Sequence, residues 1–129
     1  MKILTQPSFD HTSPVVLVVE DDLILRLDVV YTLQTEGFAV IEAGNADQAI
    51  QILEARSDIR IVFTDIQMPG SMDGIKLAAC VRDRWPPVDI IITSGKGDVR
   101  PADIPERGLY FPKPVSPNEL VSAIRGFLG

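Results

Sequence analysis

The stretch Val15–Asp22 reads VVLVVEDD, a short apolar run rich in β-branched residues that ends in three acids. A run of this length that is apolar at every position is typical of a strand covered on both faces. The runs 61–64 and 90–93 repeat the arrangement and end in Asp65 and Ser94. If these runs are neighbouring parallel strands, their carboxyl ends meet at one edge of a sheet. The sequence then gathers acids and a hydroxyl at that edge.

Segments with helical periodicity alternate with the apolar runs. The first predicted helix covers 23–36, with Leu23, Leu27, Val30 and either Leu33 or Gln34 at helical spacing. The other predicted helices are one capped by Asn45, one over 73–84 and one capped by Ser116, and the other predicted strands are 38–41 and 109–111. This alternation predicts an α/β fold, a doubly wound five-stranded parallel sheet with helices on both faces. Glycines and prolines interrupt the stretch 95–107, so we expect a short or irregular fourth helix there.

Composition narrows the possible functions. The chain has 129 residues, 46% of them hydrophobic, which is ordinary for one globular domain with a real core. The net charge of −6 argues against binding to nucleic acid or to an anionic membrane surface through bulk electrostatics. No apolar stretch is long enough to span a bilayer. The lone Cys80 fits a reducing, cytoplasmic location. We expect residues 1–13 to form a flexible tail, because they offer little to bury.

The predicted edge has the composition of a metal and phosphoryl site. Clustered carboxylates such as Glu20, Asp21 and Asp65 repel one another unless a cation lies between them. Carboxylate oxygens suit Mg²⁺, and no His or Cys lies near them in sequence to favour zinc. A carboxylate beside Mg²⁺ can attack phosphorus and form an aspartyl phosphate. Lys113 would neutralise phosphoryl charge, and Ser94 would donate a hydrogen bond to a phosphoryl oxygen.

Five short motifs carry a resemblance to a known family. They are VVEDD at 18–22, DIQMP at 65–69, MDG at 72–74, ITSG at 92–95 and FPKP at 111–114. In this order, with 44, 29 and 19 residues separating Asp21, Asp65, Ser94 and Lys113, they resemble the receiver domain of bacterial two-component response regulators. The resemblance runs from about residue 14 to residue 129. We therefore expect a receiver domain over 14–129, of the stand-alone type.

The resemblance implies a role for each acid. Asp65 would accept a phosphoryl group from a phosphohistidine of a sensor histidine kinase or a phosphotransfer protein. Asp21, Asp65 and the backbone carbonyl of Gln67 would ligate Mg²⁺ directly, and Glu20 would act through a metal-bound water. Asp22 would cap the helix that follows it. The chain would then act as a phosphoacceptor with at most self-catalysed phosphorylation and dephosphorylation, and not as an enzyme.

The resemblance also implies how the domain would switch. Lys113 would pair with the phosphate, Ser94 would supply the switch hydroxyl and Tyr110 the switch aromatic ring. A flavodoxin-like strand order of 2-1-3-4-5 and a cis peptide bond at Lys113–Pro114 follow from the family as well. The loop 68–74 has one residue more than the commoner form. Output would pass through contact with an unknown downstream protein or through a phosphorelay, and a phosphorylation-linked dimer is a further expectation.

Two other functions remain open from the sequence. A phosphatase that forms an aspartyl phosphate, similar to the haloacid dehalogenase-like enzymes, needs an acid two residues after its nucleophile. This chain has Gln67 there, and an amide cannot act as a general acid. The other function is that of a receiver-like binding module that works without phosphate. The intact set of acids argues against it, and failure to bind Mg²⁺ would favour it.

Overall fold

A computed structural model describes residues 14–70, 72–95 and 99–129, so the tail predicted for 1–13 lies outside the described residues. Five parallel strands form one sheet in the order β2-β1-β3-β4-β5. The strands are β1 (Val15–Val19), β2 (Ala39–Ala43), β3 (Ile59–Asp65), β4 (Asp89–Ser94) and β5 (Gly108–Pro112). The helices are α1 (Leu23–Thr35), α2 (Ala46–Ala55), α3 (Gly74–Arg84) and α4 (Pro117–Leu128). Both the doubly wound, flavodoxin-like fold and the strand order are as predicted.

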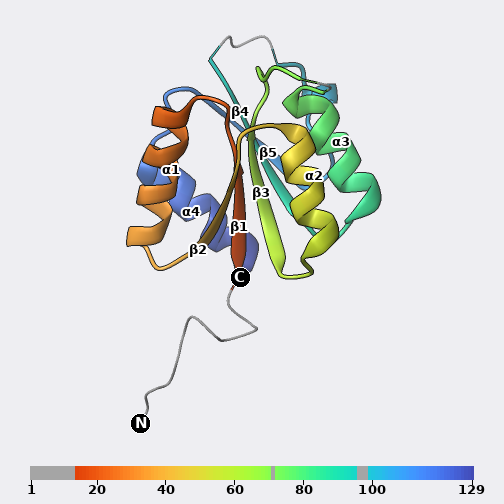
Figure 1. The fold of residues 1–129 in the computed structure, drawn as a ribbon. Coiled ribbons are helices and arrows are strands. Elements are labelled where there is room, and N and C mark those ends of the chain that lie inside the picture. The colour runs from red at the N-terminus through yellow and green to blue at the C-terminus, as the bar shows by residue number, and fades with distance from the viewer. Residues whose placement is uncertain (1–13, 71, 96–98) are drawn as a thin grey trace.

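The helices cover the two faces of the sheet in pairs. Figure 1 shows α1 and α4 on one side of the strands and α2 and α3 on the other. Alternate residues of each strand face opposite sides, so Leu17 packs in the core beneath α2 and α3, and Val18 packs beneath α1 and α4. The three central strands are therefore buried on both faces, which explains their continuous apolar runs.

Side-chain caps begin the helices where the sequence predicts them. Asp22 accepts a hydrogen bond from the Leu25 N–H at 3.1 Å, and Asn45 accepts one from the Gln48 N–H at 2.9 Å. The Gln48 side chain accepts a hydrogen bond from the Gly44 N–H at 2.7 Å, whereas a capping box would use the N–H of the cap residue Asn45 itself.

Helix α1 departs from its predicted packing. Val30 and Leu33 are buried, but Leu23 and Leu27 are 53% and 46% exposed despite their helical spacing. The apolar residues of this helix lie on most of its sides, so their spacing alone does not show which face packs on the sheet.

In its described part, the connection between β4 and β5 is irregular, as predicted. A single 3₁₀ turn at Pro101–Asp103 lies there in place of a fourth regular helix of the usual length. The loop 68–74, for which an additional residue is expected, is described except for position 71. Over the described ranges, no helix is both long enough and apolar enough to cross a membrane.

Candidate functional site

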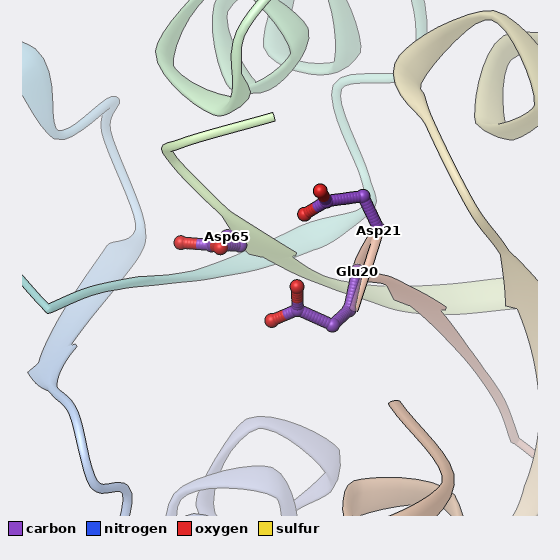
Figure 2. A group of neighbouring side chains, drawn as sticks. All are labelled: Glu20, Asp21 and Asp65. Carbon is purple, nitrogen blue, oxygen red and sulfur yellow. The ribbon is translucent and has the colours of Figure 1, made fainter. Parts of the chain in front are cut away.

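The carboxyl ends of the strands gather the predicted side chains. Glu20 and Asp21 follow β1, Asp65 and Ser94 end β3 and β4, and Lys113 follows β5. Figure 2 shows Glu20, Asp21 and Asp65 around one space above the strand ends. One carboxylate oxygen from each of these acids lies within 4.8 Å of the others. This donor set consists of hard oxygens only, which suits a small divalent cation.

Lys113 bridges two of the acids. Its Nζ lies 2.9 Å from Asp65 Oδ2 and 3.1 Å from Glu20 Oε1. Both carboxylates are almost fully buried, whereas Asp21 is exposed. The Lys113 N–H donates to the Ser94 carbonyl at 3.0 Å, and the Lys113–Pro114 peptide bond is cis, as predicted. The charge of the Lys113 ammonium compensates the two buried carboxylates that it contacts.

The electrostatics of the site favour a cation. Burial is the main influence on Glu20 and raises the pKa of its carboxyl, against hydrogen bonds from the Asp22 backbone and Lys113 that lower it. Burial lowers the pKa of the Lys113 ammonium, but its hydrogen bonds to Asp65 and Glu20 outweigh this, and the pKa is raised overall. The single Lys113 ammonium therefore neutralises only part of the charge of the Glu20 and Asp65 carboxylates. A divalent cation would relieve the repulsion that remains among the acids.

Gln67 connects the acids to the hydroxyl group. Its backbone N–H donates to Asp65 Oδ1 at 3.3 Å. Its side-chain Oε1 accepts a hydrogen bond from the Ser94 hydroxyl at 3.0 Å. Ser94 is fully buried and Gln67 is partly buried. The family resemblance implies a role for the backbone carbonyl of Gln67, but the sequence gives no signal for this side-chain contact.

Ser94 and its neighbour Thr93 face opposite sides of the sheet, as alternation predicts. Tyr110 is partly buried on the side of α2 and α3, against the same core as Ile92. The hydroxyls of Tyr110 and Thr93 are buried and have no hydrogen-bond partner among the described residues. A buried unsatisfied hydroxyl is unfavourable, so both groups would gain from a new partner or from a move towards solvent.

Two further residues, Gly74 and Arg26, shape the site. The sequence alone does not assign either of them a role in it. A Cβ on Gly74 would lie 2.0 Å from the Asp65 carbonyl oxygen, so only glycine lets α3 begin this close to the end of β3. Arg26 donates to the Glu20 carbonyl at 2.9 Å through Nη1 and to Glu42 at 3.0 Å through Nε. The motif MDG at 72–74 contributes to the family resemblance but does not indicate this close approach. The position of Arg26 in the sequence carries no signal for its contact with Glu20.

Comparison with known proteins shows the family. A sequence model described as the response regulator receiver domain matches residues 16–125. The chain therefore belongs to the response regulator receiver domain family, as the motifs indicate. A receiver domain is a signalling module of two-component systems.

Individual relatives agree with this assignment. The chain is 32% identical over 120 residues to the sensor kinase CckA of Brucella abortus, covering 90% of this chain and 13% of that protein. It is 33% identical over 116 residues to the transcriptional regulatory protein ResD of Bacillus subtilis, covering 88% of this chain and 47% of that one. A response regulator receiver protein from Sinorhizobium medicae has the same fold, with a TM-score of 0.83 at 27% identity, covering 90% of this chain and 94% of that one. The chain thus spans less than half of the length of these two curated relatives.

Proposed function

We propose that Asp65 accepts a phosphoryl group from a phosphohistidine of a sensor histidine kinase or a histidine phosphotransfer protein. In this reaction a carboxylate oxygen of Asp65 bonds to phosphorus while the phosphorus–nitrogen bond of the donor breaks and the imidazole leaves. One observation carries the proposal. Asp65 is buried, belongs to the cluster of three acids and lies 2.9 Å from the Lys113 ammonium. Glu20 shares these features, but Asp65 also accepts a hydrogen bond from Gln67, whose side chain contacts the Ser94 hydroxyl. Such a group can attack phosphorus while positive charge lies beside the transferred oxygens.

The residues present fit a magnesium ion, because the cluster offers three carboxylates and no nitrogen or sulfur ligand. Asp21, Asp65 and the Gln67 backbone carbonyl would hold the ion, with Glu20 acting through a bound water. When bound, Mg²⁺ supplies positive charge that offsets the charge on the phosphoryl oxygens. Lys113, whose Nζ lies 2.9 Å from Asp65 Oδ2, would supply further positive charge.

Ser94 and Tyr110 form the switch in this proposal. The Ser94 hydroxyl would donate to a phosphoryl oxygen, and Tyr110 would move into the space that Ser94 leaves. Phosphorylation would then shift the population between two arrangements of the domain. The unpartnered Tyr110 hydroxyl supports this role, because a buried unsatisfied group favours an arrangement in which it finds a partner among or beyond the described residues.

Helix α1 offers a surface for the phosphodonor. Of the six exposed large apolar residues among those described, five lie on this helix: Leu23, Ile24, Leu25, Leu27 and Tyr31. Ile24, Leu27 and Tyr31 are three and four residues apart and share one face, which begins two residues after the Asp22 cap. We propose that a helix of the phosphodonor packs on this face, which would bring its phosphohistidine to the adjacent acids.

The surroundings of the domain are part of the proposal. The sensor kinase similarity supports a histidine kinase as donor and a cytoplasmic location, where such donors and Mg²⁺ meet the domain. The signal would pass to a downstream protein by contact, including a phosphorylation-linked dimer, or onward by phosphorelay. The net charge of −6 disfavours nucleic acid as a direct partner.

Acetyl phosphate with Mg²⁺ tests the phosphoacceptor role without a kinase. We expect the intact mass to rise by one phosphoryl group, and we expect Asp65→Asn to abolish the increase. A mass increase that persists in Asp65→Asn would refute the assignment.

Ile24→Glu then tests the donor surface, because it should slow phosphorylation by a kinase and leave labelling by acetyl phosphate unchanged.

A further inference from the structure

We propose that the Gln67 side chain is a positioning residue that holds the Ser94 hydroxyl in a resting position and competes for it with the phosphoryl group. The inference rests on the proposed phosphorylation of Asp65 and goes beyond it, because it assigns a side-chain role to a residue expected to act through its backbone. It follows from one contact, the hydrogen bond of 3.0 Å from Ser94 Oγ to Gln67 Oε1.

The surroundings make this contact effective. Ser94 is fully buried at the end of β4, so solvent water does not compete for its hydroxyl. Gln67 is anchored at its backbone, where its N–H donates to Asp65 Oδ1 at 3.3 Å. The same residue thus contacts the phosphoacceptor through its main chain and the switch hydroxyl through its side chain.

The chemistry of a hydroxyl makes the two partners exclusive. A serine hydroxyl carries one proton, which it cannot donate to the Gln67 amide and to a phosphoryl oxygen at the same time. A charged phosphoryl oxygen is a stronger acceptor than a neutral amide oxygen. Ser94 therefore changes partner on phosphorylation. Loss of its hydrogen bond to Gln67 makes the change to the phosphoryl-bound arrangement less favourable.

The size of this effect follows from the usual strength of a hydrogen bond between neutral groups. Without the Gln67 amide, the phosphoryl-bound arrangement should be favoured about twofold to tenfold more. Beryllofluoride with Mg²⁺ imitates the phosphoryl group on an aspartate, so its apparent dissociation constant reports on this balance. Calorimetric titration measures that constant for the whole chain.

A double-mutant cycle separates the proposal from a general effect of substitution. Gln67→Met removes the amide at similar length, and we expect it to lower the dissociation constant for beryllofluoride by about twofold to tenfold. In the Ser94→Ala background the same substitution should leave the constant unchanged. Gln51→Met, on the exposed surface of α2, is the matched control and should have no effect in either background. The side-chain amide signals of Gln67 in an NMR spectrum should shift on Ser94→Ala and again on addition of beryllofluoride.

The outcomes distinguish this inference from the function on which it rests. Tighter binding of beryllofluoride by Gln67→Met only when Ser94 is present supports the inference. No change, or an equal change with and without Ser94, overturns it and leaves the phosphoacceptor role standing. A wild-type chain that binds no beryllofluoride with Mg²⁺ overturns both.

Discussion

The site has an acidic side, formed by Glu20, Asp21, Asp65 and Lys113, and a hydroxyl side, formed by Ser94, Gln67 and Tyr110. The acidic side is assembled, whereas the hydroxyl side is not yet arranged for a phosphoryl group. On the acidic side, Lys113 Nζ already lies within 3.1 Å of both Asp65 and Glu20. On the hydroxyl side, Ser94 donates to Gln67, and the Tyr110 hydroxyl finds no partner in the described part of the chain. The difference suggests a division of roles. In the proposed function, the acidic side would carry out the transfer and the hydroxyl side would respond to it.

The largest effect should come from breaking the acidic side through its backbone. Gly74→Ala would place a Cβ 2.0 Å from the Asp65 carbonyl oxygen, and relief of that clash would require movement of β3 or α3. We expect the free energy of unfolding, measured by urea denaturation, to fall by more than about 3 kcal/mol. Gly126→Ala is the control, because this exposed glycine of α4 has nothing within 4 Å of an added Cβ. It should stabilise the helix by up to about 1 kcal/mol, and equal losses in the two variants would contradict the close approach.

Removing the shared ammonium should have the next largest effect. Lys113→Met leaves two buried carboxylates without their cation, and we expect it to lower the free energy of unfolding by about 3 kcal/mol without Mg²⁺. Added Mg²⁺ should restore part of this loss, because it replaces the missing positive charge. The matched control is Lys76→Met on the exposed side of α3. A Lys113 variant as stable as this control would show that the acidic side does not depend on the ammonium.

A change to one acid should affect metal binding more than folding. Asp21→Asn removes a negative charge from the exposed side of the cluster, and we expect Mg²⁺ affinity to fall at least about tenfold in a calorimetric titration. Asp22→Asn is the comparison, because asparagine also caps helices and Asp22 serves α1. If the two variants lose Mg²⁺ affinity equally, the metal site is not built as proposed.

The smallest effect should come from the hydroxyl side. Tyr110→Phe removes a buried hydroxyl that has no partner in the described residues, so the free energy of unfolding should rise by about 1 kcal/mol. Mg²⁺ affinity should stay unchanged, because the substitution does not touch the acidic side. Tyr31→Phe, on the exposed face of α1, should change neither quantity. A loss of stability in Tyr110→Phe would mean that this hydroxyl has a partner.

Motifs at strand ends make the acidic side predictable. Each acid follows a continuous apolar run, and parallel strands bring such ends to one edge, so the amino-acid sequence alone is enough to predict the grouping of Glu20, Asp21 and Asp65. The hydrogen bond from Ser94 to Gln67 is not predictable in this way, because it joins side chains 27 residues apart whose rotamers depend on packing. The need for Gly74 is equally hidden, since it arises from the distance between α3 and β3.

The first and last helices illustrate the same limit. Helix α4 has a clear apolar stripe, and Leu120 and Ile124 on it are buried as the pattern implies. Helix α1 is apolar on most sides, so its periodicity does not say which residues face the sheet, and Leu23 and Leu27 are exposed. Their exposure is visible only in the folded chain, and it bears on function because this helix begins next to the acids of the site.

The most direct test of the central claim is to locate the phosphoryl group. After treatment with acetyl phosphate and Mg²⁺, borohydride reduces an aspartyl phosphate to homoserine, which peptide mass spectrometry then places in the sequence. The account predicts homoserine at position 65 and at no other acid of the cluster. Homoserine at position 21 or elsewhere, or no modification at all in a chain that binds Mg²⁺, would contradict it.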